Sequence, residues 1–253
     1  SLGQNFLIDE KIINQIVNCV EIGNKSILEI GPGTGNLTKQ ILERKPKIFF
    51  AIEKDKNLYY ELNRKFNSDL TLINQDVLTI NWQNLIQSKC IVFGNLPYNI
   101  SSKILINWIR LNNLNSLFHK FILMFQKEVA DRIVADVNSS KYGRLSILTG
   151  WKLKAKKIMD IDPENFYPKP KVKSSIIYLE PKNKIFRLKS SKNLEKVTDI
   201  FFQNRRKMIK KPLNILFNES SKIIKKLKLD EKSRPQNLEP LIFLKISEEY
   251  ENQ

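Results

Sequence analysis

Histidine and cysteine are scarce in this chain of 253 residues, which contains one histidine and two cysteines. The single histidine, His119, argues against a hydrolase with a histidine base and against a histidine-ligated metal, and we expect it in a loop or at a strand edge. Cys19 and Cys90 lie in apolar stretches, outside any CxxC spacing. We therefore expect no metal site and two buried free thiols in a reducing cytosol.

Long hydrophobic runs are also lacking. The longest, such as residues 48–52 and 121–125, fall far short of the roughly 18 residues that a membrane span needs. The chain begins at Ser1 rather than at methionine and shows no signal-peptide pattern. These features predict a cytoplasmic protein without a membrane passage, whose N-terminus has been trimmed.

Basic residues, by contrast, are abundant. Lys and Arg total 43 against 26 Asp and Glu, which gives a formal net charge of +17. A surplus of this size makes polyanions the leading class of partner, although a solvated lysine-rich surface would give the same composition. Motifs have to decide between the two.

Short β-rich runs alternate with longer helical patterns from residue 25 to about 180, as in a parallel sheet covered by helices on both faces. The predicted strands are 26–30, 47–53, 70–74, 90–94, 120–126, one near 153–159 and 174–179. The predicted helices are 34–44, 56–66, 101–110 and 127–134.

Beyond about residue 185 the pattern becomes helical and rich in lysine. The predicted helices there are 194–208, 213–217, 221–227 and one after Pro240. We therefore predict an α/β domain over residues 1–184 and a small all-helical domain over 185–253.

A glycine-rich turn follows the first predicted strand, with Gly31, Gly33 and Gly35 at alternate positions after Glu29. Such glycines let the backbone approach a ligand closely. The dinucleotide fingerprint has the spacing GxGxxG, whereas the spacing here is GxGxG. This pattern is typical of the first motif of methyltransferases that use S-adenosylmethionine (SAM).

Two carboxylates follow the next predicted strands. Glu53 ends the second strand, where a carboxylate can accept both ribose hydroxyls of a nucleoside, and Asp76 follows the third, where it can accept the adenine amino group. Either residue alone is more often a cap or a solvated charge. Together with the glycine turn they favour SAM over a nicotinamide cofactor, which needs a hydride-transfer site that the sequence does not reveal.

The fourth predicted strand leads into Asn95-Leu96-Pro97-Tyr98, an Asn/Asp-x-Pro-aromatic motif of enzymes that methylate ring-conjugated amino groups. The adenine N6 lone pair is delocalised into the ring and needs to be re-aimed. The Asn95 side-chain oxygen and the Leu96 carbonyl can accept the two N6 hydrogens, Pro97 fixes their convergence, and Tyr98 offers a stacking face. A simple strand-ending turn would use the same residue types.

Five segments together resemble the KsgA family of small-subunit rRNA adenine dimethyltransferases, and they span nearly the whole chain. These segments are residues 3–7, 29–35, 95–100, 166–175 and 201–207. The resemblance implies a Rossmann-like SAM-dependent methyltransferase domain with a mostly parallel seven-stranded sheet, followed by a small helical domain. It also implies dimethylation of N6 on two adjacent adenosines near the 3′ end of 16S rRNA, with a role in ribosome biogenesis.

The resemblance also assigns residues. The implied SAM contacts are Asn5, Leu7, Gly31, Gly33, Glu53, Asp76 and Asn95. The implied base pocket consists of Asn95, Leu96, Pro97, Tyr98 and Phe166. Relatives commonly carry a basic run before the position of Ser1, and its loss here would lower the affinity for RNA.

Two of these assignments have plain alternatives. Phe166 lies among prolines on a stiff loop that could close over a flipped base, and packing in the core is the less favoured alternative. The basic cluster Arg205-Arg206-Lys207, expected on a helix with Lys210 and Lys211, could neutralise rRNA phosphates or form a solvated helix face.

Two rival functions remain at this stage. One is the related enzyme type that methylates large-subunit rRNA and confers macrolide resistance, and the other is a ribosome-assembly factor in which methyl transfer is secondary. The 166–172 segment and Asn95-Leu96-Pro97 favour the small-subunit enzyme, and an intact Asn95-Leu96-Pro97-Tyr98 argues against a purely binding protein. We expect a monomer.

Overall fold

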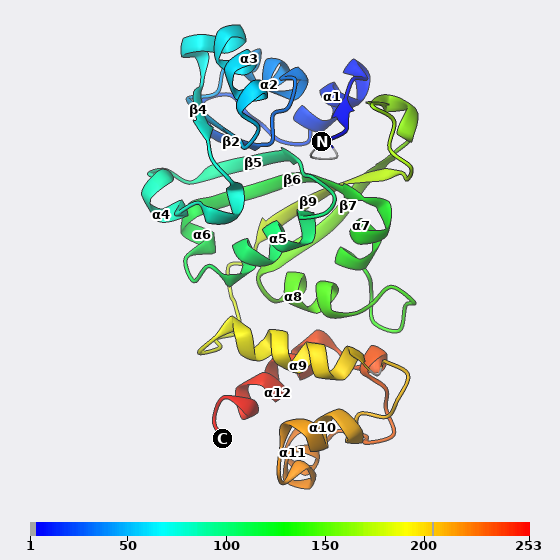
Figure 1. The fold of residues 1–253 in the computed structure, drawn as a ribbon. Helices are drawn as coiled ribbons and strands as arrows, with labels where there is room; N and C mark the ends of the chain where they lie inside the picture. Colours follow the sequence, from blue (N-terminus) through cyan, green and yellow to red (C-terminus); the bar gives the residue numbers. More distant parts are fainter. Residues whose placement is uncertain (1–3, 204) are drawn as a thin grey trace. The chain divides into compact units, whose positions relative to one another are not determined.

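The computed structural model describes residues 4–203 and 205–253 (Figure 1), so Gly3 and Asn204 of the motifs above lie outside the described residues. Contacts divide the chain into two compact units. The first, the sheet unit, runs to Ala130 and includes Ala155–Pro181, while the second, the helical unit, consists of Asp131–Lys154 and Lys182–Gln253. This division differs from the predicted boundary at residue 184 mainly because 131–154 groups with the C-terminal helices.

A seven-stranded sheet forms the centre of the sheet unit, in the order β4-β3-β2-β5-β6-β9-β7. Its strands are β2 Ser26–Ile30, β3 Ile48–Glu53, β4 Thr71–Asn74, β5 Cys90–Asn95, β6 Phe118–Gln126, β7 Leu153–Ile161 and β9 Ser174–Pro181. The pairs from β4 through β6 are parallel, and β9 joins β6 antiparallel. The predicted mostly parallel seven-stranded sheet is therefore confirmed.

Helices cover both faces of this sheet. Figure 1 shows α1, α2 and α3 on one side, and α4 and α5 on the other. The helices in this part of the chain are α1 Glu10–Val17, α2 Asn36–Leu42, α3 Lys56–Phe66, α4 Trp82–Leu85, α5 Ser101–Arg110, α6 Leu114–Leu117 and α7 Lys127–Ile133. Because helices shield both faces, β2 is buried along its whole length.

Helix starts follow local chemistry. The Asp9 carboxylate caps α1 by accepting from the Ile12 N–H at 2.9 Å. The Asp55 carboxylate caps α3 by accepting from the N–H groups of Asn57 and Leu58. Helix α2 begins at residue 36 rather than 34 because Gly35 has a left-handed φ of 83°. This turn places the start of α2 directly behind the glycine motif.

A second, two-stranded sheet joins distant parts of the chain. Strand β1, Phe6–Leu7, pairs antiparallel with β8, Phe166–Tyr167, so that Leu7 lies opposite Phe166. The Ile8 N–H extends the pairing by donating to the Asn165 carbonyl at 2.9 Å. The pairing holds the residue 4–8 segment beside the carboxyl ends of the central parallel strands.

The helical unit contains α8 Arg144–Lys152, α9 Ser191–Gln203, α10 Lys210–Leu216, α11 Ser220–Leu227 and α12 Pro240–Tyr250. Helices α9 and α12 pack through Phe201 and Phe243, whose ring centroids lie 5.4 Å apart in an edge-on arrangement. The Tyr142 hydroxyl, buried in this unit, donates to the Leu238 carbonyl at 2.9 Å. Among the described residues, no helix combines the length and apolarity that crossing a bilayer requires.

Candidate functional site

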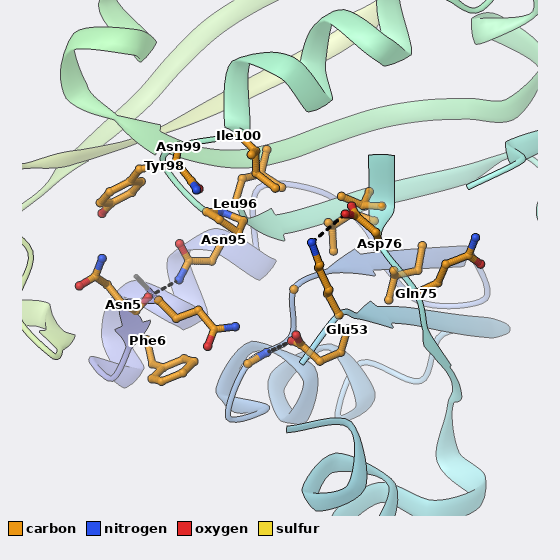
Figure 2. A pocket seen from close by; sticks show the side chains of 18 residues that line it. Asn5, Phe6, Glu53, Gln75, Asp76, Asn95, Leu96, Tyr98, Asn99 and Ile100 are labelled. Atoms are coloured by element: carbon orange, nitrogen blue, oxygen red, sulfur yellow. Dashed lines mark hydrogen bonds and ion pairs between the residues drawn. The ribbon is translucent and has the colours of Figure 1, made fainter. Parts of the chain in front are cut away.

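A pocket opens at the carboxyl ends of the central parallel strands, where open α/β sheets bind ligands (Figure 2). Four segments build it: the glycine turn after β2, the end of β3, the residues after β4 and the motif after β5. The segment around β1 adds a further wall. The lining residues are Gln4, Asn5, Phe6, Ile30, Gly31, Gly33, Ile52, Glu53, Lys54, Gln75, Asp76, Val77, Asn95, Leu96, Pro97, Tyr98, Asn99 and Ile100.

The glycine turn has a backbone conformation that residues other than glycine adopt only with strain. Gly31, Gly33 and Gly35 have φ values of 66°, 60° and 83°, all in the left-handed region. A Cβ on Gly33 would lie 2.7 Å from the Phe6 ring, so the turn and the β1 segment are in direct contact. The Gly33 position therefore needs glycine for two independent reasons.

Glu53 is held in place by the turn that it faces. Its side chain is 2% exposed, and its two oxygens accept from the N–H groups of Gly33 at 3.2 Å and Asp55 at 2.9 Å. Burial raises the pKa of Glu53, and these hydrogen bonds act in the opposite direction. Since each carboxylate oxygen can accept more than one hydrogen bond, the fixed Glu53 can also accept from two neighbouring hydroxyls.

Asp76 lies across the pocket and is already well supplied with donors. Its Oδ1 accepts from the Leu78 N–H, and its Oδ2 accepts from the Lys54 ammonium, each at 2.9 Å. The Lys54 hydrogen bond is the main reason that the pKa of Asp76 lies below its ordinary value. Figure 2 draws this ion pair as a dashed line that ends at Asp76. Lys54, which follows Glu53 in the chain, thus holds the Asp76 carboxylate at the pocket wall.

The Asn95 amide has a defined orientation. Its Nδ2 donates to the Asn5 carbonyl at 2.8 Å, which leaves Oδ1 as the free end of the side chain (Figure 2). The following Leu96 is anchored by a side chain that is 1% exposed. The turn then closes through a hydrogen bond from the Ile100 N–H to the Pro97 carbonyl at 3.1 Å. The site therefore presents a side-chain acceptor on a rigid, strand-mounted turn.

Comparisons with known proteins identify the family to which this chain belongs. The family model for ribosomal RNA adenine dimethylase matches residues 1–252. The chain belongs to the ribosomal RNA adenine dimethylase family. Its fold is the Rossmann-like methyltransferase fold, as the sequence predicted.

Relatives and solved structures agree with this membership. A Pelagibacter ubique (strain HTCC1062) protein described as ribosomal RNA small subunit methyltransferase A is 51% identical over 252 residues, covering 100% of this chain and 96% of the relative. A Wolbachia relative from Brugia malayi (strain TRS) with the same description is 40% identical, with 94% and 92% covered. A dimethyladenosine transferase from Plasmodium falciparum superposes with a TM-score of 0.84 at 27% identity over 98% of each chain. The 23S rRNA methyltransferase ErmE shares the fold. It superposes with a TM-score of 0.69 at 21% identity, over 98% of this chain and 100% of its own.

Most of the predicted cofactor residues of this dimethylase meet in the one pocket. Asn5 lines it together with the two glycines, the two carboxylates and Asn95. Leu7 does not line it: its side chain is 7% exposed and packs in the core, while its carbonyl accepts from the Asn36 side chain at 2.9 Å. Leu7 therefore contributes here by holding the β1 segment in place.

The structure places Phe166 in the core, and its contact with the target base stays a prediction. Phe166 is 3% exposed and belongs to the same buried cluster as Leu7, its neighbour in the β1–β8 pair. Successive side chains of a strand point to opposite faces, so the next residue, Tyr167, is 73% exposed instead. The core-packing alternative for Phe166 is the one that the structure adopts.

The basic cluster is also placed differently from the prediction. Residues 205–207 form a turn between α9 and α10 rather than part of a helix. The Arg205 guanidinium donates to the carbonyls of Ser139 and Ser140 at 2.7 and 2.6 Å and to the Gln236 side chain at 3.1 Å. Arg205 therefore ties loops together, while Arg206 and Lys207 are exposed.

The expectations for cysteine and histidine are met in part. Cys90 is buried, and this burial raises its pKa to about 12. Cys19 is only half-buried, and its thiol donates to the Gln15 carbonyl, so the expectation of two buried thiols is wrong for this residue. His119 is exposed and is the second residue of β6, so it lies at the end of a strand, one of the two predicted places.

Sequence reasoning missed several residues of the site. Phe6 was part of a recognised motif, but its contact with Gly33 depends on a fold-level approach that no local pattern shows. Lys54 directly follows Glu53, and this adjacency was the available signal. Ser174, whose hydroxyl lies 2.5 Å from the Tyr98 hydroxyl, belongs to the 166–175 segment, of which only Phe166 was predicted to line the site.

Proposed function

We propose that this protein transfers methyl groups from SAM to N6 of adenosine in small-subunit ribosomal RNA, producing N6,N6-dimethyladenosine in the cytoplasm. The observation that carries the proposal is the locked Asn95 amide, whose Oδ1 projects from the pocket wall that also contains Glu53 and Asp76. An acceptor for an exocyclic amine thus adjoins the residues that fit an adenosine-containing cofactor.

The pocket fits SAM by its donor and acceptor chemistry. Glu53 is buried and fixed, and it can accept the ribose hydroxyls, while Asp76 can accept the adenine amino group. The glycine turn allows the amino-acid end of the cofactor to approach the backbone closely. When bound, SAM supplies a methyl group on a sulfonium centre, so the protein's task is chiefly to orient the acceptor nitrogen.

The acceptor side consists of the 95–98 turn. Asn95 Oδ1 and the Leu96 carbonyl accept the two N6 hydrogens, which favours a pyramidal nitrogen with its lone pair facing the donor. Tyr98 offers a stacking face, a contact worth about 1–3 kcal/mol per base in nucleic-acid sites. Flipping the base into this pocket costs a few kcal/mol, which the stacking helps to offset.

The finer substrate assignment goes with this proposal. The residue 166–172 segment and the relatives described as small-subunit methyltransferases support two adjacent adenosines near the 3′ end of 16S rRNA as the target. Exposed cations of the helical unit, Arg206 and Lys207 among them, then bind rRNA phosphates. The enzyme acts as a monomer, with residues 1–184 binding SAM and 185–253 binding RNA.

The decisive experiment is transfer of labelled methyl groups from SAM to unmethylated small ribosomal subunits, followed by nucleoside analysis and primer extension. The proposal expects N6,N6-dimethyladenosine at two adjacent positions near the 3′ end of the small-subunit RNA. Label found only in large-subunit RNA would instead support the macrolide-resistance type of enzyme. Particle binding without any transfer would support an assembly factor.

A further inference from the structure

We infer that Ser174 is a positioning residue for the methylated base, because its hydroxyl holds the Tyr98 ring in place as a stacking surface. The inference rests on the proposed function, since it assumes that a base stacks on Tyr98. The two hydroxyl oxygens lie 2.5 Å apart, although the residues are 76 positions apart in the sequence. The two residues lie in separate sequence motifs, so no local pattern links them.

Ser174 is a rigid anchor. It is 0% exposed and is the first residue of β9, where it pairs with Gln126 of β6. The preceding strand entry is fixed as well, because the Lys127 N–H donates to the Lys173 carbonyl at 2.9 Å. A hydroxyl on a buried, doubly held backbone gives its partner a nearly fixed reference point.

Tyr98 is a side chain that needs such an anchor. It lines the pocket and is only half-buried, so solvent borders part of its ring. Its backbone is set by the turn, with the Ser101 hydroxyl donating to the Tyr98 carbonyl at 3.2 Å. The two side-chain torsions are then the remaining freedom of the ring, and a bond at the far end, the hydroxyl, restrains both.

The direction of the Tyr98 hydroxyl supports separate roles for the ring face, which stacks on a base, and for the hydroxyl, which bonds to Ser174. Figure 2 shows the Tyr98 ring beside Asn95, with its hydroxyl pointing away from Asp76 and the cofactor side. The ring face is thus available to a base while the polar tip is occupied by Ser174. Fixing the ring before binding removes an ordering cost that the incoming base would otherwise have to offset.

A matched control stands next to the anchor. Ser175 is equally buried, at 0% exposure, but its hydroxyl donates to Asp160 Oδ1 at 2.7 Å rather than to a residue of the pocket. Ser174→Ala and Ser175→Ala therefore remove the same atom from neighbouring buried positions. Only the first change releases Tyr98.

The test uses the full chain with an RNA fragment that carries 2-aminopurine at the target position, whose fluorescence falls when it stacks. Methyl transfer is measured in parallel on the unmodified fragment, together with SAM affinity and melting temperature. The variants are Ser174→Ala, Tyr98→Phe, the double variant and Ser175→Ala. Tyr98→Phe breaks the same hydrogen bond from the other end, so the test does not depend on one variant folding.

We expect Ser174→Ala to lower kcat/KM about tenfold, an effect that corresponds to one lost hydrogen bond of typical strength. SAM affinity should stay within about twofold, since the bond does not face the cofactor. Tyr98→Phe should show the same loss, and the double variant should lose no more than either single one. Quenching of 2-aminopurine should weaken in all three variants and remain normal in Ser175→Ala.

Two results would overturn the inference. One is unchanged quenching and turnover in Ser174→Ala, and the other is an equal loss in Ser174→Ala and Ser175→Ala that follows their melting temperatures. A wild-type protein that quenches 2-aminopurine but transfers no methyl group would count against the proposed function alone. In that case the comparison of quenching among the variants still decides the role of Ser174.

Discussion

The Asn95 side chain donates from Nδ2 to the carbonyl of Asn5 at 2.8 Å, across 90 positions of sequence. An asparagine amide can present either its oxygen or its nitrogen to a pocket, and this hydrogen bond selects the oxygen. In the proposed reaction, acceptance of an amine hydrogen by Asn95 therefore depends on the segment that contains Asn5. The β1–β8 pair and the Asn36 side chain hold that segment in place.

Asn95→Ala should abolish most methyl transfer while leaving RNA binding intact, because it removes the side-chain acceptor for N6. Loss of one such pre-placed group typically lowers kcat by about 10²–10³-fold. Single-turnover transfer to small subunits and filter binding of the RNA fragment measure the two properties separately. Turnover equal to that of the wild type would refute the assignment.

Asn36→Ala is the matched test of the supporting segment. It removes the donor to the Leu7 carbonyl, outside the main pocket, and should reduce turnover less than Asn95→Ala does. We expect a loss of about 1 kcal/mol in unfolding free energy, typical of one hydrogen bond. Chemical denaturation measures it, and a larger kinetic defect than that of Asn95→Ala would contradict this order.

Gly33→Ala should impair SAM binding through two separable causes. The φ of 60° strains an alanine by about 1 kcal/mol or more, and the new Cβ would lie 2.7 Å from the Phe6 ring. Adding Phe6→Ala should restore part of the affinity, since it relieves the clash but not the strain. Calorimetric titration with SAM checks both variants, and the absence of any rescue would argue against contact between the turn and the β1 segment.

Glu29 makes stability depend on pH. Its side chain is 1% exposed and accepts from the Thr38 hydroxyl at 2.7 Å, and burial raises its pKa to about 8 from an ordinary 4.5. Between these values the folded state keeps a proton that the unfolded chain releases, so stability falls as pH rises through this range. Glu29→Gln lacks this loss and should melt higher than the wild type at pH 8.5.

The same comparison at pH 5 should show a much smaller difference, because both forms are then neutral at this position in the folded state. Glu61→Gln, on the exposed face of α3, serves as the control and should shift the melting temperature equally at both values of pH. A pH-independent difference for Glu29→Gln would show that its carboxyl stays ionised in the fold.

Glu53→Gln should weaken SAM binding by about 10–100-fold, because hydrogen bonds to a charged acceptor contribute roughly 1.5–3 kcal/mol. The amide keeps the size of the side chain but loses one of the two acceptor oxygens. Calorimetry with SAM and with S-adenosylhomocysteine measures the change, with Glu61→Gln again as control. Equal SAM affinities of Glu53→Gln and the wild type would show that another residue contacts the ribose.

Arg205 and Lys207 should differ in kind although both are basic. Arg205→Gln removes donors to two carbonyls of its own unit and should lower the melting temperature by several degrees, as about 1–2 kcal/mol does in a small domain. Lys207→Gln should leave stability unchanged and reduce the slope of log affinity against log salt by about 1. Binding of the RNA fragment at several salt concentrations checks the second effect.

The strands of the main sheet could be predicted from sequence because buried parallel strands form continuous apolar runs between turn residues. β2 was predicted with its observed bounds, and β3 and β4 begin one residue later than predicted. Helix α8 was not predicted, because a helix that is buried on several sides shows no polar face and no helical periodicity in its sequence. Helix α9 was predicted to reach residue 208 but ends at Gln203, and the exposed Met208 continued a pattern that the fold does not use.

The polar residues of the site were predictable and their supports were not. Glu53, Asp76 and Asn95 follow strands, so the general rule for open sheets places them together. The acceptor for the Asn95 amide, the clash at Gly33 and the anchor of Tyr98 all arise between segments 27 to 90 positions apart. Such contacts are set by tertiary approach, for which a single sequence carries no local pattern.

The pairing of β1 with β8 also bears on when the enzyme becomes competent. Leu7 and Phe166 close a loop of the chain that contains β2 to β7, and closing a long loop costs more conformational entropy than closing a short one. The pocket wall that Asn5 and Phe6 form therefore depends on a contact that only the folded chain supplies. If SAM binds as proposed, a partly unfolded chain would have the glycine turn and both carboxylates and still fail to retain the cofactor, so retention of SAM would report a finished fold.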